Sequence, residues 1–146
     1  MIARELMLLL FERFCWFDSA LQARMLDHGS PEISRPQSMV MLCIASGTTR
    51  PADVARRVGV SRQAIYATIN QLVDRELIYL TDDPDDRRQK QLAMTDYGQR
   101  AREDAHKSLA ELGDILVERI GMDRLEAMLA ALRADWGSTN INLIDN

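Results

Sequence analysis

The polar side chains best suited to recognising another molecule lie between residues 61 and 75. As a set they carry little net charge but many hydrogen-bond donors and acceptors. Asparagine and glutamine can form paired hydrogen bonds with adenine, arginine can do so with guanine, and a threonine methyl can contact thymine. A helix that presents such groups near its start suits the major groove of DNA. The candidates for base contacts are Arg62, Gln63, Tyr66, Thr68 and Asn70, and Ser61 and Arg75 are expected nearer the phosphates.

A second candidate is the charged segment at residues 82–88, which reads DDPDDRR. It is too polar for a core and is turn-prone at its proline. Arg87 is expected at the tip, where it can reach a minor groove whose narrow A·T-rich stretches concentrate negative potential. Arg88 is expected to pair with Asp86 and with a phosphate. The alternative is an ordinary solvated charge cluster.

Residues 51–72 predict the two short helices that would position the base-reading side chains. Pro51 fits the first position of a helix because its missing N–H would be unpaired there in any case. Gly59 can end that helix in a left-handed conformation, and Ser61 can cap the next one. The inward side chains of the second helix follow helical spacing at Ile65, Ile69 and Leu72. The pattern favours a DNA-binding helix-turn-helix over a plain helical hairpin, although Tyr66 could equally pack between helices.

The sequence period changes after this pair of helices. Residues 77–81 are short and β-prone, and residues 89–94 loosely alternate polar and apolar side chains. Two strands around a charged loop, directly after a helix-turn-helix, make a winged helix. The predicted fold class is therefore mainly α with a small β-hairpin wing.

Long apolar patterns flank the predicted winged helix on both sides. Residues 3–27 form one predicted helix and residues 35–46 a second, very apolar one. Downstream, residues 96–120 and 122–136 predict two more helices, with Thr95 capping the first of them. The apolar stripe of the first helix comprises Leu6, Leu10, Phe14, Phe17, Leu21 and Met25. One winged domain cannot cover all of these stripes, so the terminal helices are predicted to pair with a second copy.

Composition and charge exclude several other classes. The chain of 146 residues is 47% hydrophobic, which is enough to build a core, and it carries a formal charge of −4. Residues 50–90 hold eight cationic and seven acidic side chains, so the acidic excess lies outside them. Such a distribution argues against indiscriminate coating of nucleic acid. A near-neutral middle segment with acidic flanks fits a small DNA-binding surface joined to parts of the chain that do not bind DNA.

The opening segment and the cysteines predict a cytoplasmic protein. Glu5, Glu12 and Arg13 interrupt the apolar run at the start, so neither a signal peptide nor a membrane span is expected. Cys15 and Cys43 lack the spacing of a disulfide framework or a zinc site. No metal, cofactor or catalytic constellation is predicted, and an enzyme is not expected.

The order of these elements, with DPDDRR followed by LAMTDYG, resembles the MarR family of bacterial transcription regulators from about residue 3 to residue 136. The wing of that family shows Asp, any residue, a cation, Asp, any residue and Arg. Here the six positions are Asp83, Pro84, Asp85, Asp86, Arg87 and Arg88, so Asp85 replaces the first cation. The resemblance implies a homodimer whose first and last helices interlock and which binds an inverted repeat in double-stranded DNA.

The resemblance also implies a division of the single chain, residues 1–146. Residues 36–95 would form the DNA-binding lobe, residues 3–28 and 96–136 the dimerisation helices, and residues 137–146 a frayed tail. A small-molecule site would lie where the first and second helices meet the start of the fifth. Its candidates are Phe14, Phe17, Met25, Met39 and Cys43, with Arg35 and His28 as polar anchors. Such a pocket would suit an aromatic or aryl carboxylate ligand that relieves repression, and a plain hydrophobic junction is the alternative.

Two further functions remain open. Cys15 could sense peroxides, as a first-helix cysteine does in some members of the resembled family, although no tyrosine near residues 35–40 would support a thiolate. The winged helix could instead serve protein interaction without DNA. An interaction module has no need of the paired arginines in the wing, so the wing favours a DNA-binding regulator.

Overall fold

The computed structural model describes residues 1–139, which form a mainly helical fold with one hairpin. The predicted fold class is confirmed. In chain order, the elements are α1 (Ile2–Asp27), α2 (Arg35–Ala45), α3 (Pro51–Val58), α4 (Arg62–Asp74), β1 (Ile78–Asp82), β2 (Lys90–Met94), α5 (Asp96–Ile120) and α6 (Met122–Arg133).

The chain divides into two compact units, Met1–Ala110 and Glu111–Asn146. The boundary falls inside α5, whose first part lines a cavity together with α1, α2 and the hairpin. Each unit is described by itself below.

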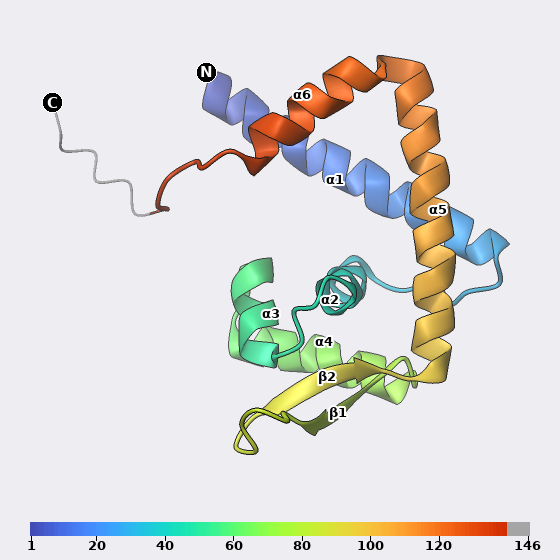
Figure 1. Cartoon of the computed structure of the whole chain (residues 1–146), viewed down its shortest axis with the longest axis vertical. Helices are drawn as coiled ribbons and strands as arrows, with labels where there is room; N and C mark the ends of the chain where they lie inside the picture. The colour runs from blue at the N-terminus through green and yellow to red at the C-terminus, as the bar shows by residue number, and fades with distance from the viewer. Residues whose placement is uncertain (140–146) are drawn as a thin grey trace, which may run out of the picture. The chain divides into compact units, whose positions relative to one another are not determined.

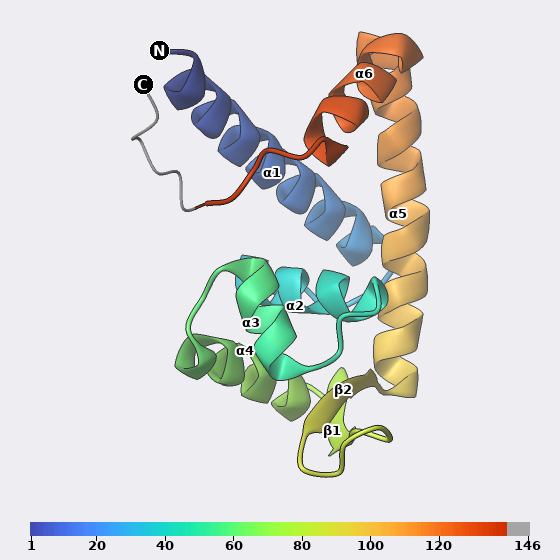
Figure 2. The ribbon, with the colours of Figure 1, turned by 60° about the vertical axis from the view of Figure 1, so that its left-hand side comes forward.

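The first unit contains a three-helix group with the hairpin beside it. In Figure 1 and Figure 2, α2, α3 and α4 lie together, and β1 follows directly from the end of α4. Their shared core consists of apolar side chains that are almost fully buried: Val40, Val54, Ile65, Ile69 and Leu72. Burial of these groups fixes the polar side of α4 outward, because the apolar side faces the core.

The turn between α3 and α4 has the local structure that the sequence predicts. Pro51 occupies the first turn of α3, and Gly59 ends that helix with a left-handed φ of 78°. The Ser61 hydroxyl accepts a hydrogen bond from the Ala64 N–H at 3.1 Å, which satisfies one of the unpaired amides of α4. These three features depend only on neighbouring residues, so the turn can form without contacts from distant parts of the chain.

The hairpin is antiparallel, and Leu80 pairs with Leu92 at its centre. β1 is shifted by one residue from the predicted segment 77–81, and β2 begins one residue later than the predicted segment 89–94 and ends with it. The Leu92 N–H also donates to the carbonyl of Thr49 at 2.8 Å. This bond ties β2 to the segment that leads into α3, so the wing is attached to the helix-turn-helix from two directions.

The start of α5 lies unusually close to the end of the α4–β1 turn. Thr95 caps α5, since its hydroxyl accepts from the Gly98 N–H at 3.0 Å and lies 2.6 Å from the carbonyl of Glu76, to which it donates. A Cβ at Gly98 would lie only 2.0 Å from the carbonyl oxygen of Leu77. Glycine is therefore required here for the close approach of two backbones.

In α1, only the C-terminal half is buried within the chain. Leu21 and Met25 are each 5% exposed, whereas the large apolar side chains of the first eleven residues are exposed. The predicted apolar stripe of α1 is thus buried within the chain at its C-terminal end and exposed to solvent at its N-terminal end. The open part comprises Ile2, Leu6, Met7, Leu8, Leu9, Leu10 and Phe11.

In the second unit, α6 buries none of its side chains. It ends at Arg133, three residues before the predicted limit, because Ala134 turns to an extended conformation with ψ 153°. The Trp136 indole then folds back and donates to the carbonyl of Ala131 at 2.8 Å. Residues 140–146 of the predicted tail lie outside the described residues. Over residues 1–139, no helix combines the length and hydropathy that a membrane span requires.

Candidate nucleic-acid interface

The outward side of α4 carries the predicted base-reading side chains. Arg62, Gln63 and Asn70 are exposed, and Tyr66 is 42% exposed rather than packed between helices. Thr68 is half-buried, and its hydroxyl donates to the carbonyl of Ala64 at 3.3 Å. The structure therefore places these five side chains on one helix of the first unit, and four of them, Arg62, Gln63, Tyr66 and Asn70, are exposed to solvent.

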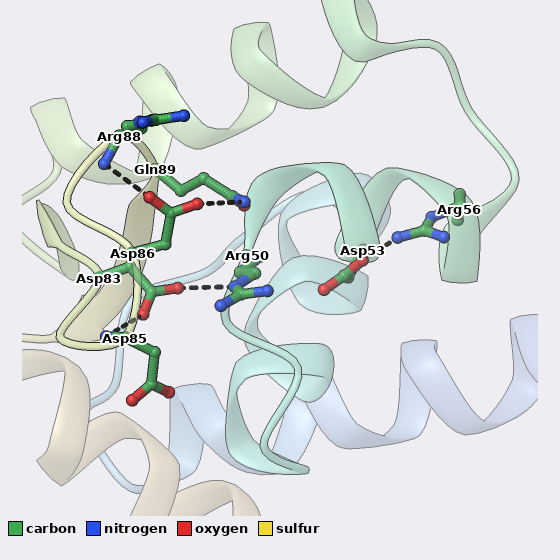
Figure 3. Close-up of polar contacts among 8 residues, drawn as sticks. All are labelled: Arg50, Asp53, Arg56, Asp83, Asp85, Asp86, Arg88 and Gln89. Carbon is green, nitrogen blue, oxygen red and sulfur yellow. Dashed lines mark hydrogen bonds and ion pairs between the residues drawn. The ribbon is translucent and has the colours of Figure 1, made fainter.

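The loop of the wing, residues 83–89, is held in shape by Asp86. Its carboxylate accepts from the Arg88 N–H at 3.0 Å and from the Gln89 side-chain amide at 3.1 Å, as Figure 3 shows. Its carbonyl accepts from the Gln89 N–H at 2.9 Å. The predicted pairing of Arg88 with Asp86 thus forms through the backbone amide, not through the guanidinium. In this tight loop the backbone amides lie close to the Asp86 carboxylate, whereas the Arg88 guanidinium extends away from it on a long side chain.

An ion pair clamps the wing to the start of α3. Arg50 Nε lies 2.6 Å from Asp83 Oδ2, and the second carboxylate oxygen accepts from the Asp85 N–H at 2.9 Å (Figure 3). The hydrogen bond from Arg50 is the main cause that lowers the pKa of Asp83 below its usual value, and the same bond raises the pKa of Arg50. Asp83 is only 3% exposed. A buried carboxylate requires such a partner, so the clamp is a fixed part of the site that the sequence analysis did not foresee.

After these pairings, the charged side chains of the wing loop that form no ion pair among the described residues are Asp85, Asp86, Arg87 and Arg88. Lys90 pairs with Asp82 across the base of the hairpin, and Arg50 neutralises Asp83. Arg87 and Arg88 are exposed, and neither forms a salt bridge among the described residues. Their guanidinium groups are therefore available to phosphates and to a minor groove.

Arg75, expected near the phosphates, has contacts inside the protein. Its Nη1 donates to Gln37 Oε1 at 3.2 Å, and its Nη2 donates to the carbonyl of Glu32 at 2.6 Å. These bonds direct the guanidinium toward the start of α2.

Two other arginines near the turn are also engaged in contacts within the protein. Arg56 pairs with Asp53, and Arg57 donates to Thr48 Oγ1 at 2.7 Å.

A cavity of about 180 Å³ lies within the first unit, between α1, α2, the hairpin and α5. Of the seven predicted pocket residues, Met25 alone lines it. Its walls are mostly apolar, and its charged or polar lining side chains are Gln22, Ser38, Arg102 and His106. Arg102 and His106 stand one turn apart on α5 and are exposed, so they lie at the opening. The sequence analysis missed both, because a cation on a long helix is ordinarily a solvated surface group.

The other predicted pocket residues lie elsewhere. Arg35 pairs with Asp18 at 3.0 Å, and its guanidinium lies 5.9 Å from the centre of the Phe14 ring, so it joins α2 to α1. Phe17 packs edge-on against Trp16 at 5.2 Å. Arg35 is thus engaged in the core contact and does not anchor a ligand in this cavity.

The remaining predicted pocket residues are Met39, Cys43 and His28. Met39 is half-buried, and His28 is exposed where α1 ends. Cys43 is buried, and that burial raises the pKa of its thiol. Cys15 is half-buried on α1. Among residues 1–139, no group of three or more histidine, cysteine or acidic side chains is arranged to hold a metal ion.

Comparison with known proteins identifies the winged helix. Residues 32–89 match the model of the MarR family, whereas no curated protein matches the sequence at a significant level. Among solved structures, a MarR-family transcriptional regulator from Rhodococcus sp. RHA1 is 22% identical, with 90% of this chain and 92% of that chain covered and a TM-score of 0.68. The structural match covers most of the chain, so it supports the whole fold and not the winged helix alone.

Two further solved structures carry names that mention a ligand. The PcaV transcriptional regulator from Streptomyces coelicolor, in complex with its natural ligand, is 25% identical over 71% of this chain and 74% of that chain, with a TM-score of 0.56. BpsR of Bordetella bronchiseptica, whose DNA binding is regulated by 6-hydroxynicotinic acid, is 17% identical over 88% and 96%, with a TM-score of 0.66. PcaV and the Rhodococcus protein are named as transcriptional regulators. Residues 32–89 therefore resemble the MarR family, and the chain shares its fold with solved transcriptional regulators.

Proposed function

We propose that this protein is a homodimeric, sequence-specific DNA-binding regulator that recognises an inverted repeat and acts as a ligand-relieved repressor. The observation that carries the proposal is the combination, in one compact unit, of an exposed polar edge on α4 and a braced wing with two unpaired arginine side chains. An α-helix fits the major groove, and an arginine on a hairpin fits the adjacent minor groove.

The bases would be read from the start of α4. Arg62 and Gln63 lie in its first turn and Tyr66 in its second, all exposed. The Ser61 cap leaves the remaining amide donors of the helix start directed outward, where a phosphate is favoured by the helix dipole. Asn70 lies two turns further on, so it would reach the edge of the same groove.

A second copy of the chain would cover the exposed apolar side chains of the terminal helices. In the first unit, the open end of α1 presents Phe11, which is 61% exposed, and Met7, which is 69% exposed. In the second unit, α6 presents Met128, Leu129 and Leu132, each more than 40% exposed. Contiguous exposed apolar side chains on a monomer mark an interaction surface. Two-fold symmetry would then place two α4 helices about one DNA turn apart, roughly 34 Å.

The cavity of the first unit would receive a small molecule with one aromatic ring and an acidic group. Its volume of about 180 Å³ is close to that of an engineered protein cavity, about 150 Å³, that binds benzene. Arg102 at the opening supplies a cation for a carboxylate. PcaV, with its natural ligand, and BpsR, regulated by 6-hydroxynicotinic acid, support a ligand-responsive function in this fold. The ligand would act by binding the DNA-free arrangement more tightly than the DNA-bound one.

The test is a fluorescence-anisotropy titration with duplexes from the protein's own promoter region, alongside light scattering to measure oligomeric state. We expect a dimer that binds one inverted repeat far more tightly than a scrambled duplex. Arg87→Ala should weaken binding and flatten the dependence of log affinity on log salt, because fewer counterions are released. A monomer, or a protein that does not distinguish any of these duplexes, would overturn the proposal.

A further inference from the structure

A hydrogen-bonded cluster centred on one buried side chain joins the start of α2 to the last turn of α4. At its centre is Gln37, which is 7% exposed. Gln37 Oε1 accepts from the Ser34 N–H at 3.0 Å and from Arg75 Nη1 at 3.2 Å, while Gln37 Nε2 donates to Gln71 Oε1 at 3.1 Å. Arg75 extends the cluster to the carbonyl of Glu32 at 2.6 Å. One amide side chain thus contacts both the segment that begins α2 and the helix that carries the base-reading residues.

The cluster constrains α4 in a way that its apolar core cannot. Ile65, Ile69 and Leu72 hold α4 at a fixed depth, but burial of apolar surface is non-directional and permits small rotations and slides. Hydrogen bonds are directional, and a bent or stretched bond weakens steeply. Because Gln37 is removed from water, an alternative rotation of α4 would leave buried polar atoms unpaired, which is costly.

The partners of Gln37 lie at one end of α4, and the base-reading residues lie at the other. Gln71 and Arg75 sit about two to three turns after Arg62 and Gln63. A rotation of the last turn of a rigid helix is carried along its whole length. Base contacts require placement within about half an ångström, so a small rotation at this end would remove them.

We infer that Gln37, with Gln71 and Arg75, is a positioning cluster that sets the orientation of the recognition helix on DNA. The inference rests on the proposed function and deepens it. Arg75 acts on DNA through Gln37 and Glu32 and not as a phosphate contact. Gln37 is a specificity-determining residue, although it touches no base.

The test separates orientation from charge by comparing affinity with its salt dependence. Gln37→Leu, Gln71→Leu and Arg75→Gln are titrated against the operator fragment and against a scrambled duplex. We expect each to lower operator affinity about tenfold, to leave affinity for the scrambled duplex unchanged, and to leave the salt slope of the wild type unchanged. Arg87→Gln is the contrasting variant, because loss of a direct contact lowers the slope by about 0.9 per phosphate.

Three controls keep the result interpretable. Gln37→Glu retains the acceptor for Ser34 and Arg75, and the Gln71 amide can reverse to donate to it, so this variant should bind as the wild type does. Gln99→Leu makes a comparable change at an exposed glutamine of α5 and should have no effect. The double variant Gln37→Leu with Arg75→Gln should lose no more affinity than either single variant, because both break one cluster.

The possible results fall into distinct classes. A reduced salt slope in Arg75→Gln with a normal slope in Gln37→Leu would show a direct phosphate contact and overturn the inference alone. Equal losses of affinity for the operator and for the scrambled duplex would also overturn the inference. Gln71→Leu and Arg75→Gln alter exposed residues, so they decide the matter even where Gln37→Leu fails to fold. A wild type that binds no inverted repeat would refute the proposed function, and the inference with it.

Discussion

Arg50 and Asp83 are 33 positions apart in the chain, yet a 2.6 Å contact between Nε and Oδ2 holds the wing against the start of α3. The pair fixes the distance between the two parts of the site that would touch DNA. Arg50 immediately precedes the first residue of α3, and Asp83 immediately follows the last residue of β1. Since α3 packs on α4, the wing and the recognition helix are held as one body.

The first prediction concerns this clamp. Arg50→Gln removes the ion pair and leaves a buried carboxylate, so the wing should detach from α3 and exchange its amide hydrogens faster. We expect hydrogen exchange to rise over residues 83–89 while the exchange of α4 stays as in the wild type. Operator affinity should fall with it. Arg56→Gln, which breaks an exposed pair with Asp53 on the same helix, is the matched control and should change neither. Unaltered exchange in the loop of Arg50→Gln would contradict the prediction.

The second prediction concerns pH and the same pair. Because the pKa of Asp83 is lower in the folded protein than its ordinary value of 3.8, its carboxylate stabilises the fold above that value. The stabilisation is lost as the pH falls through the lowered pKa. Thermal melts between pH 7 and pH 2.5 should therefore show a smaller acid-induced decrease in Tm for Asp83→Asn than for the wild type. Parallel curves for the two proteins would exclude Asp83 as a contributor.

The winged helix was predictable because its determinants are local. Pro51, Gly59 and Ser61 each favour one backbone conformation, and the isoleucines of α4 repeat at helical spacing, so no distant contact was needed to place the turn. The wing followed from a change of period and a loop too charged to be buried. The strand limits moved by one residue because the pairing register depends on both strands together.

The contacts that organise the site could not be predicted in the same way. Asp83 looks like one acid among the four of residues 82–88, and only the folded chain brings Arg50 to it. The Ser34–Gln37 capping box has a readable local pattern, but the further bonds of Gln37 to Gln71 and Arg75 join residues more than 30 positions apart. These bonds depend on how α2 crosses α4, which the sequence period does not specify.

The predicted pocket differs from the cavity for a related reason. α1 is apolar on several sides, so its period does not reveal which side faces α2 within one chain. On α1 the predicted pocket residues are Phe14, Phe17 and Met25, whereas the cavity is lined by Leu21, Gln22 and Met25, so only Met25 is shared. Arg35 is predicted as a polar anchor, but Asp18 of α1 pairs with it.

The third prediction concerns the close approach at the start of α5. Gly98→Ala places a methyl group 2.0 Å from the Leu77 carbonyl oxygen, so the backbone of α5 or of the α4–β1 turn must move. We expect a loss of about 2–3 kcal/mol in the free energy of unfolding, measured by urea titration at fixed protein concentration. Gly113→Ala in the same helix meets no atom within 4 Å and should instead stabilise by up to about 1 kcal/mol. Equal effects of the two substitutions would contradict the close contact.

The fourth prediction concerns the cavity and its cation. Benzoate, a single ring with a carboxylate, should bind the protein and raise its Tm, because the ring fits among apolar walls and Arg102 faces the opening. Arg102→Gln should weaken benzoate binding about tenfold by calorimetry and should remove most of its salt dependence. Benzamide, which has nearly the same shape and no charge, should bind the wild type and Arg102→Gln about equally. Arg100→Gln is the matched control, since Arg100 lies over the Tyr97 ring and outside the cavity. If Arg102→Gln and Arg100→Gln weaken benzoate binding to the same small extent, the Arg102 guanidinium does not recognise the carboxylate. The cavity then selects its ligand by shape alone.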